Sequence, residues 1–72
     1  MVRIEKIRAD ISREIKVVDL QVSTAADLPA LGGNVAGIVI AAGSIAQVVQ
    51  TGDFVTLDSN GSWYDESGNE VS

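Results

Sequence analysis

The feature that most constrains this chain is its small size combined with the lack of both cysteine and histidine: it has 72 residues and contains neither. A chain of this length forms one domain and buries only about 60% of the surface that it exposes when unfolded, so its core is marginal. Small domains usually compensate with disulfides, a metal ion or self-association. Without cysteine and histidine, this chain can form no disulfide and has no thiolate or imidazole ligand for a metal site. We therefore expect no cofactor and no metal, and we predict self-association.

The charges are few and unevenly placed. Ten acidic and five basic residues give a formal charge of −5, which argues against nucleic acid as a partner, because phosphate binding needs clustered cations. No cation follows residue 16. Such asymmetry is typical of a chain with a docking end and a solvated end, although chance in a short chain explains it equally well. The five cations are Arg3, Lys6, Arg8, Arg13 and Lys16.

Neither a signal peptide nor a membrane span is predicted. Met1 is followed by a charged stretch instead of a basic start and an apolar run. The most apolar window, residues 35–49, is interrupted by Gly37, Gly43 and Gln47, whereas a membrane span needs roughly twenty predominantly apolar residues. We expect no membrane partner.

Residues 1–15 carry isoleucines at a spacing that favours a helix with one apolar stripe. A strand is the competing interpretation, because isoleucine and valine favour extended backbone, but Lys6 followed by Ile7 breaks the alternation that Val2 and Ile4 begin. We predict a short N-terminal helix or extended arm over residues 1–15 and a small β domain over residues 16–72. The stripe packs on the chain's own sheet or forms a self-association surface. Its members are Ile4, Ile7, Ile11 and Ile15.

The rest of the chain reads as β-structure. Residues 15–22 alternate between apolar and polar side chains, which is the period of a half-buried strand. Thr24 and Asp27 then form a helix-start signal, which Pro29 limits to about one turn. Further strands are expected over residues 35–42, 45–50 and 54–58.

The sequence Asn60-Gly61 is the strongest hairpin signal in the chain, because both residues tolerate the positive φ of a type I′ turn. The return strand would begin at Trp63. Together these segments predict a mainly β fold, a small antiparallel β-meander that carries the N-terminal helix or arm.

No catalytic residue is predicted. General acid–base catalysis most often uses histidine, which is absent, and Asp65 and Glu66 would point to opposite faces of a strand. Asp58, Asn60 and Asp65 recur like calcium ligands, but a hairpin turn explains them better than an EF-hand does.

The aromatic side chains offer one candidate binding site. We expect Trp63 to be a core residue, because a domain with three aromatic residues can hardly leave its largest one in solvent. Tyr64 would lie on the opposite face of the strand, where it is the candidate exposed ligand contact.

Short motifs follow one another in a set order between Val22 and Gly68. They are Asp27-Leu28-Pro29, Gly43-Ser44, Thr51-Gly52-Asp53-Phe54, Leu57 and Asn60-Gly61-Ser62-Trp63-Tyr64. Their order and spacing resemble a short module of bacteriophage head-fibre and tail-fibre proteins, although this chain lacks the long stalk of most fibres.

The resemblance implies a non-enzymatic virion structural protein: a head-fibre, capsid-decoration or fibre-base module. Its partners would be further copies of itself, most simply in a homotrimer, and capsid or tail proteins of the phage. It would be made in the bacterial cytoplasm and reside in the virion. The alternative is a small glycan- or host-surface-binding β module.

Overall fold

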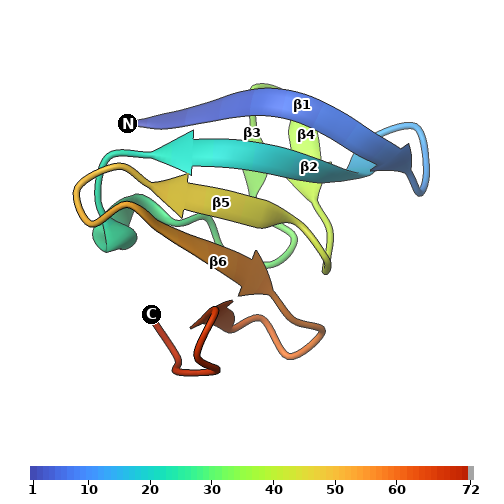
Figure 1. Ribbon diagram of the computed structural model, residues 1–72. Helices are drawn as coiled ribbons and strands as arrows, with labels where there is room; N and C mark the ends of the chain where they lie inside the picture. The colour runs from blue at the N-terminus through green and yellow to red at the C-terminus, as the bar shows by residue number, and fades with distance from the viewer. Residues whose placement is uncertain (72) are drawn as a thin grey trace.

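The computed structural model describes residues 1–71, which form one curled, seven-stranded mixed sheet with a single short 3-10 helix (Figure 1). The order across the sheet is β3–β4–β2–β5–β6–β7, and β1 pairs with β2. The mainly β prediction is confirmed, whereas the prediction of a wholly antiparallel meander is wrong. The elements are β1 (Val2–Asp10), β2 (Ile15–Val22), η1 (Ala25–Asp27), β3 (Asn34–Val35), β4 (Ile38–Ile40), β5 (Ile45–Val48), β6 (Asp53–Leu57) and β7 (Trp63–Asp65).

The N-terminal segment is a strand, so the helix prediction is wrong and the extended alternative is correct. In β1, Ile4 and Ile7 lie opposite Leu20 and Val18 of β2. Three residues of regular strand would place Ile4 and Ile7 on opposite faces, because the side-chain period is two. The register shifts between Ile4 and Lys6, so a β-bulge adds one residue and places both isoleucines on the same face of the strand. The isoleucine spacing that is typical of a helix is, in this chain, the spacing of a bulged strand.

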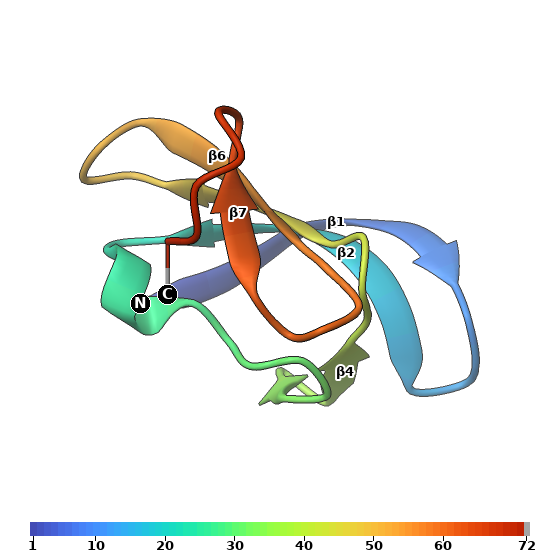
Figure 2. The same cartoon turned by 90° about the horizontal axis from the view of Figure 1, so that it is seen from below.

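β2 lies at the centre of the mixed pairing. It pairs in parallel with β4 at Ile15 and Lys16, and in parallel with β5 from Asp19 to Val22. Parallel neighbours need a connection that crosses back along the sheet. The segment after β2 provides it: Figure 2 shows this chain, drawn in green, running past η1 to β3 and β4. A sequence reading that joins successive strands by tight turns misses this crossover.

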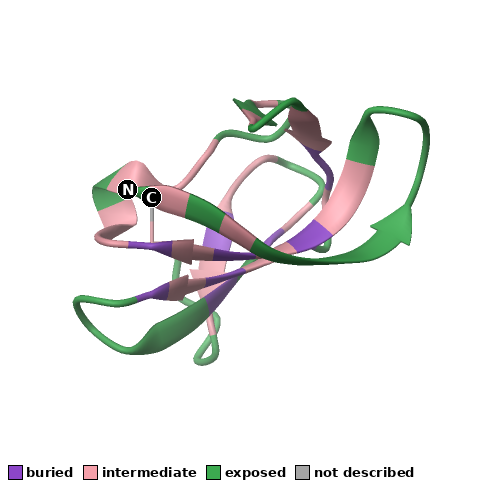
Figure 3. Cartoon of the chain, turned by 90° about the horizontal axis from the view of Figure 1, so that it is seen from above, coloured by how far each residue is buried: buried purple, intermediate pink, exposed green. Residues whose placement is uncertain are grey.

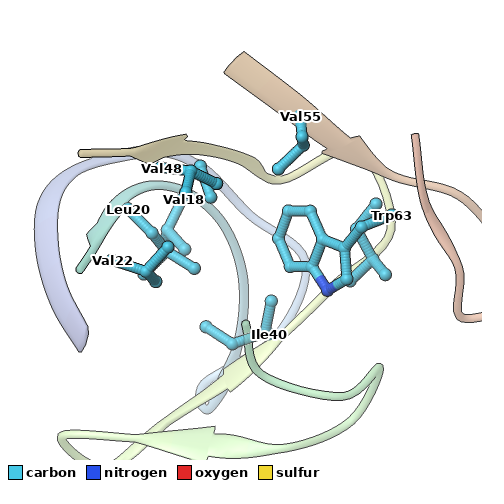
Figure 4. Packing of buried hydrophobic residues seen from close by; sticks show 9 residues of the cluster. Val18, Leu20, Val22, Ile40, Val48, Val55 and Trp63 are labelled. Carbon is cyan, nitrogen blue, oxygen red and sulfur yellow. The ribbon is translucent and has the colours of Figure 1, made fainter. Parts of the chain in front are cut away.

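The core lies inside the curl of the sheet, where Trp63 is 1% exposed and Ile40 is fully buried. Figure 4 shows Ile40 of β4 and Trp63 of β7 pointing toward each other, although these strands lie far apart in the sheet order. The indole Nε1 of Trp63 donates a hydrogen bond of 2.7 Å to the carbonyl oxygen of Pro29. The expected core position of Trp63 is confirmed. The other buried members of this cluster are Val18, Leu20, Val22, Ala46, Val48, Val55 and Leu57.

One polar side chain is completely buried next to this core. The hydroxyl of Ser44 accepts a hydrogen bond from the backbone N–H of Val18 (3.1 Å) and donates one to the carbonyl of Ala41 (2.8 Å). Both bonds satisfy a group that would otherwise be costly to bury. Ser44 thereby ties the start of β5 to β2.

The hairpin turns differ from the predicted ones. Within residues 1–71, Ala36 is the one non-glycine residue with positive φ (52°), and it precedes Gly37 at 84°. Because a type I′ turn needs positive φ at both central residues, the type I′ turn of this fold joins β3 to β4. It splits the strand predicted over residues 35–42.

At Asn60-Gly61 only the glycine has positive φ (90°), so the predicted type I′ geometry is wrong although the hairpin exists. The Asp58 carboxylate oxygen Oδ1 accepts hydrogen bonds from the N–H groups of Asn60 (3.0 Å) and Ser62 (2.9 Å). An aspartate at the head of a turn commonly braces it in this way.

Candidate functional site

The side of the sheet opposite the core, which we call the outer face, has polar and apolar side chains in cross-strand rows. In one row Ile45 lies beside Thr56, and Thr56 lies beside Tyr64. In the next row Gln47 lies beside Phe54. These side chains point outward because their strand neighbours Ala46, Val55 and Trp63 are buried. The outer face consists of Asp19, Gln21, Ile45, Gln47, Phe54, Thr56 and Tyr64.

An open pocket of about 300 Å³ lies in the outer face between β1 and β6. Its apolar part includes Phe54, which is 48% exposed, and Ile45. Its polar part holds an amide and two carboxylates. The residues that line it are Glu5, Asp19, Leu20, Ile45, Gln47 and Phe54.

Phe54 was not singled out by the sequence reading, although a signal for it exists. In β6, Val55 and Leu57 are buried, and Phe54 alternates with them on the same side as the polar Thr56. A strand that places a threonine on its solvent side also places the phenylalanine two residues away there. The period of β6 therefore predicts an exposed aromatic ring.

The second notable surface is the hairpin arm, which we define as residues 6–16: the end of β1, the turn, and the start of β2. Figure 3 shows the projecting end of this hairpin coloured as exposed. Ile7 is 45%, Ile11 61% and Ile15 38% exposed, whereas Ile4 packs against the core. The predicted stripe is thus divided, with one isoleucine serving the fold and three lying in the arm.

Charged groups of the arm are partly paired within the chain. Arg8 donates to Asp19 and to the carbonyl oxygen of Gly43, each at 2.6 Å, and Lys16 pairs with Asp10 at 2.7 Å. Nearer the N-terminus, Arg3 pairs with Glu5 at 2.6 Å. In the part of the chain that the structure describes, Lys6 and Arg13 have no ion-pair partner.

The aromatic candidates have separate positions. Trp63 is inside the core with its indole nitrogen bonded, so it offers no ring to a ligand. Tyr64 is half-buried on the outer face, next to Thr56. Of the three aromatic residues, Phe54 presents the most exposed ring.

The carboxylates of the second hairpin serve its turns. Asp65 repeats the arrangement of Asp58: its Oδ1 accepts hydrogen bonds from the N–H groups of Ser67 and Asn69, both at 2.9 Å. Among residues 1–71, no three acidic side chains are close enough together to hold a metal ion. The single helix in that range, η1, is far too short to cross a membrane.

One carboxyl group has a shifted pKa. The N-terminal ammonium of Met1 donates a hydrogen bond of 2.8 Å to Asp27, and this bond holds the pKa of the Asp27 carboxyl below its ordinary value. The backbone N–H of Thr24 also donates to the same oxygen at 3.3 Å. Asp27 therefore ties the start of β1 to η1.

The chain matches no protein-family model, no curated protein and no solved structure.

Proposed function

We propose that this chain is a non-enzymatic structural module that acts by associating with copies of itself, most simply as a homotrimer, and by attaching to a larger particle. The particle we propose is a bacteriophage virion, in which the chain would serve as a head-fibre, capsid-decoration or fibre-base module.

The observation that carries this proposal is the exposed apolar surface of the hairpin arm. Ile7, Ile11 and Ile15 are 38–61% exposed in a domain whose small core would gain from every buried side chain. Fully burying one isoleucine contributes roughly 1.5–3 kcal/mol relative to leaving it exposed. Burying these three side chains and Phe54 against another copy would favour association.

The edge of β1 supports contact through side chains instead of open-ended strand addition. Within residues 1–71, β1 pairs with β2 only, so its other edge carries N–H and C=O groups without a strand partner. Charges and bulges protect such edges, and β1 has both: charged side chains along its length and two shifts in register. These features disfavour association by strand addition at the edge of β1.

The motifs behind the phage resemblance lie in the core of the domain and in its turns. Trp63 bonds to Pro29, Leu57 pairs with Trp63, and the backbone of Leu57 exchanges hydrogen bonds with Gly43 and Ser44. These short motifs form the core and its turns. We therefore expect a related module to retain them. They name no ligand site.

The first test is the absolute mass of the purified protein, measured by light scattering over a range of concentrations. We expect a trimer or another closed oligomer. A folded monomer at every concentration would contradict the self-association part of the proposal.

The second test concerns the particle. Antibodies against the chain would be used on phage particles purified by density gradient from the bacterial strain that encodes it. We expect the chain to band with the particles. Its presence only in the soluble fraction, after particles have formed, would contradict the virion part alone.

The alternative, binding of a glycan or host surface, now rests on Tyr64, because Trp63 is buried. Tyr64 is half-buried, and no contact favours a sugar over a protein surface there.

A further inference from the structure

Within residues 1–71, the charged side chains without an ion-pair partner lie in the hairpin arm and from residue 53 onward. In the arm they are Lys6, Arg13 and the carboxylate of Glu14, which together leave one net positive charge. From residue 53 onward the described chain has five carboxylates and no cation, and none of them forms an ion pair within residues 1–71. These carboxylates belong to Asp53, Asp58, Asp65, Glu66 and Glu70.

The topology keeps these two regions apart. β1 lies on one side of β2, and β5, β6 and β7 follow in order on the other, so the arm and the acidic hairpins occupy opposite ends of the sheet (Figure 1). Within residues 1–71 of one copy, no ion pair joins Lys6 or Arg13 to these carboxylates. A second copy can bring the two regions together.

Apolar groups accompany the charges in the arm and on the outer face. The arm presents Ile11, the most exposed of its isoleucines. The outer face presents Phe54 and Ile45 in an open pocket of about 300 Å³, which extends to Glu5 of β1 and Asp19 of β2. A pocket of that volume admits the four carbons of an isoleucine side chain. The backbone of Glu70 forms an isolated antiparallel β-bridge with Tyr64, so this acidic residue lies beside the β7 edge of the outer face.

We infer that copies of this chain associate head to tail: the cationic, isoleucine-bearing hairpin arm of one copy docks on the β5–β7 part of the outer face of the next. This inference rests on the proposed self-association and specifies its geometry. Because the two contacting surfaces differ, the interface is heterologous, and it gives a ring of defined size if the rotation between copies closes. A symmetric contact, arm against arm, would bring the unpaired cations of two copies together, with only Glu14 of each copy to offset them, and would leave the acidic ends unpaired.

The lack of native cysteine makes cross-linking an unambiguous test. Ile11→Cys places one thiol at the tip of the arm, and Thr56→Cys places one in the middle of the outer face; both positions are exposed. In the double variant, we expect mild oxidation to give covalent species larger than a dimer on a non-reducing gel. Each single variant should stay monomeric on the same gel. The matched control is Ile11→Cys with Ser59→Cys, which moves the second thiol to the exposed turn beyond β6.

We expect the Ile11→Cys/Thr56→Cys variant to cross-link about tenfold faster than the control, because docking raises the local concentration of the two thiols. Light scattering on the unmodified protein separates the possible failures. An oligomer whose Ile11→Cys variant alone forms a covalent dimer uses a symmetric contact, and an oligomer without any cross-link uses another surface. Either result overturns the head-to-tail inference and leaves the proposed self-association standing. A monomer at all concentrations overturns both.

Salt dependence provides a second measurement that needs no variant. Attraction between the arm and the acidic end is screened by added salt. We expect the association constant of the unmodified protein to fall several-fold between low and high ionic strength. Association that strengthens or stays constant with salt would contradict the role assigned to the charges.

Discussion

The core and the hairpin arm both contain isoleucine and polar groups, but these groups are buried or hydrogen-bonded in the core and exposed or unpaired in the arm. Ile40 on β4 is fully buried, whereas Ile11 in the arm is 61% exposed. Trp63 faces Ile40 and has its only polar atom bonded, whereas Lys6 and Arg13 in the arm have no ion-pair partner within residues 1–71. The difference shows that the core maintains the fold, and the exposed arm is the surface on which the proposed self-association rests.

The largest effect should come from emptying the core. Trp63→Ala removes the biggest buried side chain and leaves the Pro29 carbonyl without its donor. We expect a loss of about 3–5 kcal/mol in the free energy of unfolding, enough to unfold so small a domain. Urea denaturation followed by circular dichroism measures it. Trp63→Phe, which keeps a ring, should lose less; an equal loss would mean that the bond to Pro29 dominates.

The same substitution at two isoleucines tests the comparison directly. Ile40→Ala should cost about 2–5 kcal/mol, because it opens a cavity in the core. Ile11→Ala should change the stability by less than about 0.5 kcal/mol at low protein concentration, because its site is exposed. It should instead weaken self-association in light scattering. Similar destabilisation by both variants would contradict the division between core and arm.

A pair of glycines tests the hairpin at the edge of the core. Gly61→Val forces a β-branched residue to positive φ, at a cost of about 1–2 kcal/mol, and brings its methyl groups against Leu31. Gly68 has a similar φ of 86° in an equivalent turn but has open space around it. Gly68→Val should therefore destabilise less in urea denaturation. The reverse order would mean that the contact with Leu31 stabilises the variant.

A smaller effect should come from the β3–β4 turn. Ala36 has a φ of 52°, a conformation that asparagine adopts more readily than alanine. We expect Ala36→Asn to raise the free energy of unfolding by about 0.5–1 kcal/mol. Ala30→Asn, at an exposed site without positive φ, is the control. No gain at Ala36 would mean that this turn is not strained.

The smallest effect concerns acid stability at the start of the arm strand. Because the pKa of Asp27 is lowered in the folded protein, its ionised form stabilises the fold above the ordinary pKa of about 4. That contribution is lost as the pH falls through the lowered pKa. We expect Asp27→Asn to flatten the acid limb of a plot of urea midpoint against pH. An unchanged slope would show that the bond to the Met1 ammonium has no energetic consequence.

Local patterns were enough to predict much of the β-structure. The strand over residues 15–22, the brief turn of helix before Pro29 and the buried Trp63 all follow from side-chain period, capping and size. The exposed Phe54 could also have been read from the period of β6. The N-terminal strand could not, because a bulged strand and a helix can share a three-residue spacing.

The sequence by itself determined that this chain is a small, mainly β domain without cysteine or histidine, and that its cations all lie within the first sixteen residues. Only the tertiary structure decided that β2 has parallel neighbours, that Ile4 serves the core while Ile11 does not, and that the cationic and acidic regions lie at opposite ends of one sheet. The physical reason is that side-chain period and turn chemistry act over a few residues. Strand order depends on which long-range pairing buries the most apolar surface.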